Sequence, residues 1–90
     1  MDTLIERLIA NYVSKLKEQD VIQFALKNDI NLKDDEVRIV YGTIQKYWRE
    51  IIFGNHERIL QKIKGKINNG TYQKIEELII LYKEKYHSYL

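Results

Sequence analysis

The chain has 90 residues, a net charge of +2 and 44% hydrophobic residues, which predicts a single domain spanning residues 1–90. A domain of this size supports one core but not a buried active-site cavity with its supporting shell. The absence of cysteine excludes disulfides and thiolate metal sites. The longest apolar run, residues 78–82, is far below the roughly 20 residues of a membrane span, and no secretion signal is evident. We therefore expect a cytoplasmic protein without membrane association.

The predicted fold class is all-α, a compact bundle of four to five helices. The chain has no proline and only four glycines, so the strongest helix breakers are missing from nearly every segment. The two-residue alternation of a half-buried strand is not sustained anywhere.

The first helix is predicted to begin at Asp2 or Thr3, because Thr3 and Glu6 have the spacing of a capping box. It is expected to end near Lys17. Its apolar residues follow the rhythm of a helix lying on a core, which predicts burial of Leu4, Ile5, Leu8, Ile9, Tyr12, Val13 and Leu16.

The second helix is predicted to open with the acidic residues of 18–20, which complement the positive end of a helix dipole. Its expected inner face is Val21, Phe24 and Ala25. Asn28 and Asp29 are suited to end it, and residues 30–32 are expected to be briefly extended.

The third helix, predicted over residues 34–53, is the element against which the rest of the chain can pack. Three acids, Asp34, Asp35 and Glu36, occupy its first turn, where exposed carboxylates complement the dipole. One apolar stripe then recurs every three or four positions, through Val37, Val40, Tyr41, Ile44, Trp48 and Ile51.

Gly54 and Asn55 are a good helix stop and a good N-cap, so a tight turn and a helical hairpin are predicted there. The fourth helix is expected to end at residues 68–70. Its predicted inward residues are Ile59, Leu60, Ile63 and Ile67, and its predicted outer stack is Arg58, Lys62 and Lys66.

The fifth helix is predicted from about Thr71 to the C-terminus, with a heptad-like apolar seam. The seam comprises Tyr72, Ile75, Ile79, Tyr82, Tyr86 and Tyr89, and Leu78, Ile80 and Leu81 widen it. This is more apolar surface than one neighbouring helix needs. The helix is therefore either central to the bundle or paired with another chain.

The pattern of the chain resembles the YqfT-like proteins, a family of small uncharacterised proteins of Gram-positive bacteria grouped as a domain of unknown function. The resemblance covers nearly the whole chain and is carried by residues 21–25, residues 28–32, Ile52-Phe53, Glu57-Arg58-Ile59 and the closing apolar helix. Lys17 and Lys33 stand where the family tends to have threonine N-caps. The resemblance implies a cytoplasmic helical protein and transfers no catalytic residue.

The sequence gives no indication of an enzyme, a metal site or a cofactor. His56 and His87 each have one carboxylate neighbour, whereas metal sites need three or four converging ligands. No nucleophile motif or glycine-rich phosphate loop occurs. We expect a non-enzymatic protein that binds a partner.

A protein partner is the leading hypothesis, through the fifth helix. Aromatic residues with a polar tip suit interfaces, and the predicted interface residues are Leu78, Leu81, Tyr82, Tyr86 and Tyr89. The partner is another protein or a second copy in a homodimer. The alternative is a fifth helix that packs only on its own bundle, and it agrees with the apolar pattern at least as well as an interface does.

Nucleic acid is the second hypothesis. Residues 46–90 carry nine Lys and Arg against five Asp and Glu, whereas residues 1–45 carry six against eight. The predicted phosphate contacts are Lys46, Arg49, Arg58, Lys62 and Lys66. The alternative is an ordinary solvated helix face. A helix-turn-helix that reads DNA through the third helix is disfavoured by the acids of its first turn.

Overall fold

The structure is a computed structural model that describes residues 3–86. Within this range the chain forms five helices, α1 (Leu4–Lys15), α2 (Glu18–Lys27), α3 (Asp34–Phe53), α4 (His56–Gln61) and α5 (Asn69–Tyr86). The described residues contain no β-strand, and the all-α prediction is confirmed. None of these helices combines the length and apolarity that crossing a bilayer requires.

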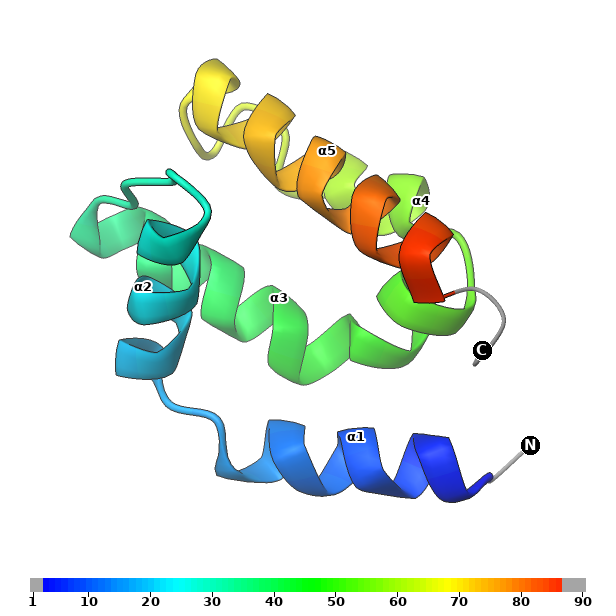
Figure 1. Cartoon of the computed structure of the whole chain (residues 1–90). Coiled ribbons are helices and arrows are strands. Elements are labelled where there is room, and N and C mark those ends of the chain that lie inside the picture. The colour runs from blue at the N-terminus through cyan, green and yellow to red at the C-terminus, as the bar shows by residue number, and fades with distance from the viewer. Residues whose placement is uncertain (1–2, 87–90) are drawn as a thin grey trace.

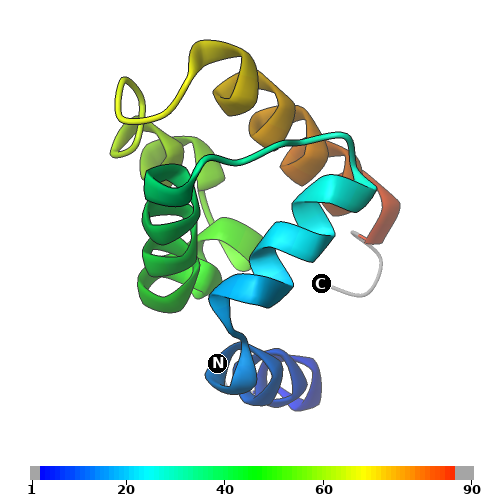
Figure 2. The same cartoon turned by 90° about the vertical axis from the view of Figure 1, so that its left-hand side faces the viewer.

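Helix α3 is the central element, as predicted. It contacts α1, α2 and α4, while α5 packs on α4. In Figure 1, α3 runs between α5 above and α1 below, and Figure 2 shows α1 lying below the rest of the molecule. The radius of gyration is 12.8 Å, close to the ~12 Å of a compact domain of this length. The chain is therefore about as compact as an ordinary globular domain of its length.

A buried apolar cluster lies where α4 gives way to α5. Leu60, Ile63, Ile67 and Tyr72 form one buried cluster. Ile59, which precedes Leu60 in the chain, is completely buried. The inward positions predicted for this region are confirmed, and so is the burial of Trp48 in α3.

The predicted fourth helix is too long. It ends at Gln61, and the chain then turns through Gly65, whose φ of 86° lies in the left-handed region that favours glycine. Asn68 does not end α4. Its side-chain Oδ1 accepts hydrogen bonds from the backbone N–H groups of Gly70 (2.8 Å) and Thr71 (3.3 Å) at the start of α5. Lys62 and Lys66 therefore do not continue a helical row that begins at Arg58.

The predicted hairpin turn at Gly54-Asn55 and the predicted caps at Thr3 and Asn55 are confirmed. Thr3 caps α1 by accepting the backbone N–H of Glu6 (3.1 Å). Asn55 caps α4 by accepting the backbone N–H of Arg58 (3.3 Å), directly after Gly54 ends α3. The short loop places α3 and α4 against each other.

The residues that precede α2 and α3 are lysines, whose side chains cannot accept a hydrogen bond from the backbone. The third helical residue supplies the cap instead, because Asp20 accepts the backbone N–H of Lys17 and Glu36 accepts that of Lys33, both at 2.9 Å. Each carboxylate thus closes half of a capping box, reaching back to the residue before the helix.

Glu36 was expected among exposed acids, but it is buried. Its second carboxylate oxygen accepts the backbone N–H of Asn68 at 2.8 Å. One side chain therefore ties the start of α3 to the segment that opens α5. The periodic pattern could not reveal this role, because the partner lies 32 residues away.

The predicted buried face of α1 is largely wrong. Only Val13 is buried, and Ile9 and Leu16 are half-buried. The exposed apolar residues of this face are Leu4, Ile5, Leu8 and Tyr12. Phe24 of α2, also predicted inside, is 48% exposed. The contacts of α1 are chiefly with α3, so the residues of its apolar face that do not meet α3 stay exposed.

Candidate functional site

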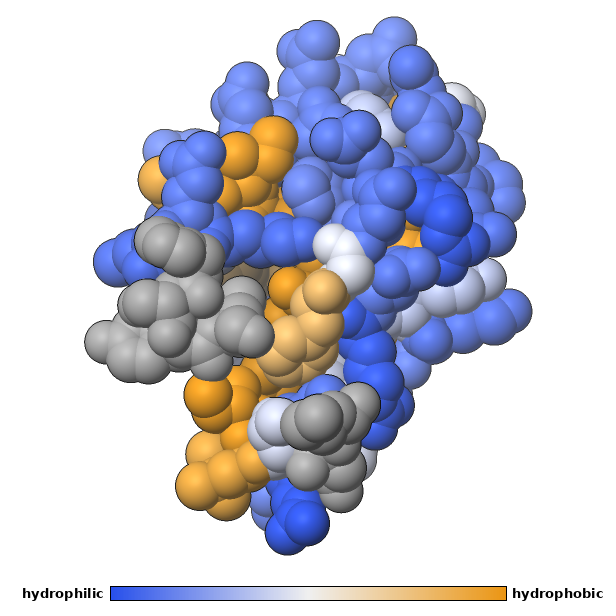
Figure 3. Space-filling model, turned by 90° about the vertical axis from the view of Figure 1, so that its right-hand side faces the viewer, coloured by the Kyte–Doolittle hydropathy of each residue, from blue (hydrophilic) through white to orange (hydrophobic). Residues whose placement is uncertain are grey.

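An apolar cleft of about 530 Å³ separates α1 and α2 from the C-terminal half of α5, with α3 as its floor. Figure 3 looks from the side on which α1 begins and α5 ends, and apolar side chains gather in the hollow between these ends. The cleft is lined by residues of all five helices, which include Ile9, Tyr12, Phe24, Ile44, Trp48, Leu60, Leu78, Tyr82 and Tyr86. Its volume lies within the ~300–1,000 Å³ range of ligand sites.

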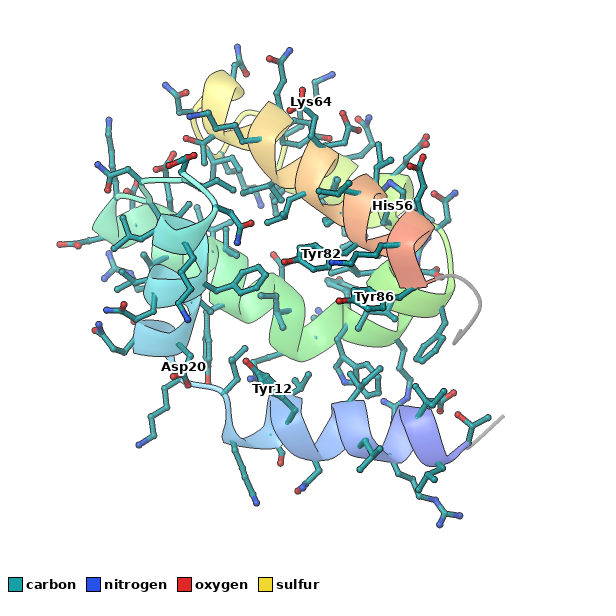
Figure 4. The ribbon with its side chains drawn as sticks, viewed as in Figure 1. Tyr12, Asp20, His56, Lys64, Tyr82 and Tyr86 are labelled. Carbon is teal, nitrogen blue, oxygen red and sulfur yellow. The ribbon has the colours of Figure 1, made fainter. Side chains whose placement is uncertain are left out.

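Aromatic rings form the walls of the apolar cleft. Tyr12 rises from α1, while Tyr82 and Tyr86 point from α5 toward the same space (Figure 4). The Tyr82 and Tyr86 rings stack with centroids 5.9 Å apart, and Phe24 of α2 meets Tyr82 at 6.0 Å. Aromatic side chains supply large contact areas with few rotatable bonds, which suits binding surfaces.

Two charged residues, Asp20 and Lys83, take part in the lining of the apolar cleft. The Lys83 ammonium donates to the Gly54 carbonyl at 2.8 Å and lies 3.2 Å from Nδ1 of His56. Nε2 of His56 is buried and has no hydrogen-bond partner among the described residues. Lys83 thus joins the end of α5 to the α3–α4 turn and positions the wall that Tyr82 and Tyr86 occupy.

The interface residues predicted on α5 divide into three groups. Leu78, Tyr82 and Tyr86 line the apolar cleft. Leu81 is 59% exposed and is not part of the cleft. Tyr89 lies outside the described residues. The sequence reasoning missed the opposite walls on α1 and α2, because the apolar pattern that could have indicated them was assigned to the core.

A second, shallow surface depression, the basic groove, has a volume of about 610 Å³ and is open to solvent. Its residues from α3 are Arg38, Ile39, Gly42, Thr43, Lys46 and Tyr47, and its residues from the segment after α4 are Lys62, Ile63 and Lys66. The groove brings together three of the five predicted phosphate contacts, Lys46, Lys62 and Lys66. The groove also includes Arg38, which was not predicted because it lies before residues 46–90, the segment with the excess of Lys and Arg.

The other two predicted contacts, Arg49 and Arg58, lie outside the basic groove and are paired. Arg49 lies 3.7 Å from a carboxylate oxygen of Glu6, with its guanidinium 4.3 Å from the centroid of the Trp48 ring. Arg58 forms an ion pair of 2.6 Å with Glu50. The hydrogen bond from Arg58, together with the backbone N–H of Asn55, lowers the pKa of Glu50 below its usual value.

Within residues 3–86, no three His, Asp or Glu side chains converge in a manner that suits a metal ion. His56 has a lysine as its neighbour, with Nδ1 3.2 Å from the Lys83 ammonium, and His87 falls outside the described residues. The two concave surfaces are therefore the features of the described chain that carry a functional argument.

Comparison with family models, with curated proteins and with solved structures finds no match to this chain. The resemblance to the YqfT-like proteins stays a prediction.

Proposed function

We propose that the protein is a non-enzymatic binding protein that acts through the apolar cleft, and that the occupant of the cleft is helix α1 of a second copy. The observation that carries this proposal is an apolar cleft beside an amphipathic helix that leaves part of its own apolar face uncovered. Helix-in-groove recognition needs both of these surfaces.

The uncovered face of α1 has the form of a docking helix. Leu4, Leu8 and Tyr12 are spaced four residues apart, so they form one stripe along the helix, and they are 71%, 61% and 58% exposed. Tyr12, at the end of the stripe, also lines the cleft of its own molecule. Exposed large apolar residues that adjoin one another commonly mark interfaces. The stripe belongs to a 12-residue helix that contacts the rest of the fold chiefly through α3.

A second copy is the occupant that these surfaces favour over an unrelated partner. Each molecule offers both the stripe and the cleft, so a two-fold arrangement would place the α1 of each copy in the cleft of the other. Such an isologous contact buries the same surfaces twice, and two-fold dimers are the commonest assemblies of soluble proteins. The cytoplasm is the proposed location, supported by a chain without cysteine.

The test is sedimentation equilibrium of the full chain across micromolar concentrations, beside the variants Leu8→Glu and Asn11→Glu. Both positions are exposed on α1, and both variants gain one negative charge. The parent is expected to dimerise. Leu8→Glu is expected to abolish the dimer and keep its helical content, and Asn11→Glu is expected to retain the dimer.

A parent that stays monomeric, or a dimer that both variants weaken equally, contradicts the proposal. The variant Leu81→Glu distinguishes a dimer formed through the apolar cleft from a dimer formed through the outer face of α5. Because Leu81 does not line the cleft, the dimer should survive this charge. If Leu81→Glu disrupts the dimer and Leu8→Glu does not, the interface is the outer face of α5 and the occupant proposed here is wrong.

Cross-linking checks the same contact without relying on disruption. The chain contains no cysteine, so Leu8→Cys and Phe24→Cys each introduce a single thiol. Mixing the two variants under mild oxidation should give a disulfide between the α1 stripe of one copy and the cleft wall of another. Asn11→Cys is the matched control for Leu8→Cys. Equal cross-linking yields from the two α1 positions would contradict the proposed orientation.

A further inference from the structure

We infer that the basic groove binds the phosphate backbone of a single-stranded nucleic acid. This site is separate from the apolar cleft and does not depend on the proposed dimer. The argument starts from the charge of the groove, since Arg38, Lys46, Lys62 and Lys66 contribute to its lining and no carboxylate does.

No carboxylate neutralises the positive charge of the four side chains in the groove. None of them forms an ion pair with another described residue, whereas the nearby Arg49 and Arg58 are each paired with a glutamate. Like charges brought together repel one another. A surface that concentrates unpaired positive charge in a concave region attracts polyanions and accelerates their association.

The Tyr47 ring holds two of the lysines in place. The ammonium groups of Lys46 and Lys62 lie 5.3 Å and 5.5 Å from its centroid, which is cation–π distance. Lys46 comes from α3 and Lys62 from the segment after α4, so one ring fixes cations from both walls of the groove. At Tyr47 the backbone of α3 departs from helical geometry, with φ −124° and ψ 16°.

Gly42 lies on the same stripe of α3 as Arg38 and Lys46, four residues from each. Glycine in a helix interior is destabilising relative to alanine. A Cβ atom added at Gly42 would meet nothing within 4 Å, so packing does not require glycine here. What the missing side chain does provide is room in the groove between the two cations.

The spacing of the cations favours a strand over a small anion. Arg38 and Lys46 are eight residues apart, or about 12 Å along the helix axis, so one phosphate group does not reach both. Successive phosphates of one strand do. A lysine-rich groove in which two cations are spaced along one helix suits contact with successive phosphates and does not require base recognition.

The test is fluorescence anisotropy of the full chain with a labelled single-stranded RNA of mixed sequence. Four phosphate contacts predict a slope of about −2.8 in log affinity against log salt concentration, so affinity should fall about 50-fold between 50 and 200 mM salt. The triple variant Lys46→Gln, Lys62→Gln and Lys66→Gln should bind more weakly and lose about 2 from this slope.

The matched control removes three exposed lysines outside the groove, Lys15→Gln, Lys27→Gln and Lys64→Gln. Both triple variants lose the same net charge. A general charge effect would weaken them equally, and that result overturns the inference, as does a parent that does not bind RNA at 50 mM salt. Pyrophosphate that binds as tightly as the RNA would also overturn it, because the site would then be one for a small anion.

The variant Gly42→Leu is designed to block the groove without unfolding the protein. Leucine favours the helix, and open space surrounds the added Cβ. The variant is therefore expected to raise the melting temperature and to weaken RNA binding at least tenfold, because the side chain fills the groove. Unchanged affinity in the more stable variant would remove Gly42 and the space above it from the site.

Discussion

The two ends of α5 lie in contrasting environments. Its first turns pack on the buried cluster of Leu60, Ile63 and Ile67. Its last turns, which carry Tyr82 and Tyr86, face the apolar cleft. Ile75 and Ile79 pack on the cluster and also line the inner end of the cleft, so the apolar seam passes from the core into the hollow along the helix.

This contrast follows from what each end of α5 meets. The beginning of α5 is tied to α3, because Glu36 accepts the backbone N–H of Asn68 just before the helix. The end of α5 faces α1 across the cleft, and the contacts of α1 are chiefly with α3. An apolar face therefore shows that a helix can bury surface, while the element that covers it has to be found in the structure or in a partner.

The largest expected effect is a loss of stability on substitution of Trp48, compared with substitution of the exposed Leu8. Trp48 is buried on α3, so Trp48→Ala should lower the free energy of unfolding by ~3–5 kcal/mol. Leu8 is mostly exposed, so Leu8→Ala should stay within ~0.5 kcal/mol of the parent. Urea denaturation at low micromolar concentration measures both.

Protein concentration sharpens this contrast. If α1 docks into a second copy, the effect of Leu8→Ala should grow as concentration rises, since the dimer stabilises the folded state by mass action. The effect of Trp48→Ala should be present at every concentration. A loss of stability below 1 kcal/mol for Trp48→Ala would place this ring outside the cooperative core.

The next largest effect concerns Glu36, whose hydrogen bond to Asn68 links α3 to the beginning of α5. The Glu36 carboxylate accepts two backbone N–H groups, from Lys33 and Asn68, in a buried position. Glu36→Gln leaves one oxygen and turns an amide donor toward the second N–H. The expected cost is ~1–3 kcal/mol, because a buried polar group loses its partner.

Asp35→Asn is the matched control, since Asp35 is the exposed acid next to Glu36 in the same first turn. It should change the free energy of unfolding by less than ~0.5 kcal/mol. Equal effects of the two variants would mean that the helix dipole, and not the link to Asn68, accounts for the contribution of Glu36.

Local and periodic features of the sequence predicted most of the fold. The all-α class, the central helix with Trp48, the Gly54-Asn55 turn and the Thr3 cap depend on neighbouring residues or on helical spacing, and all are confirmed. The end of α4 was missed because Gly65 lies inside an apolar pattern that continues to Ile67. There a glycine in the left-handed region outweighed the periodicity.

The candidate sites were less predictable, because they depend on contacts between distant segments. Leu78, Tyr82 and Tyr86 were selected on α5, but the opposite walls at Tyr12 and Phe24 become visible only when the helices are placed. Charge counting found Lys46, Lys62 and Lys66. It did not show that Arg49 and Arg58 are paired, nor that Arg38 joins the groove.

The smallest expected effect concerns the exposed ion pair between Arg58 and Glu50, at the α3–α4 turn that connects the two environments. The Arg58 hydrogen bond is the largest cause that lowers the pKa of Glu50 from 4.5, and Lys83 contributes by charge alone. Because this pKa is lower in the folded state, the stabilisation is present above pH 4.5 and is lost as the pH falls through the folded value.

Arg58→Gln should therefore raise the pKa of Glu50 toward 4.5, as followed by NMR titration of its side-chain carboxyl group. Lys64→Gln, which removes an exposed cation that is not among the causes of the shift, should leave this pKa unchanged. The pair is open to solvent, so its loss should alter stability at pH 7 only slightly. An unchanged pKa of Glu50 in Arg58→Gln would mean that the Asn55 backbone N–H holds the carboxylate at the turn, and Arg58 would then become available to other anions.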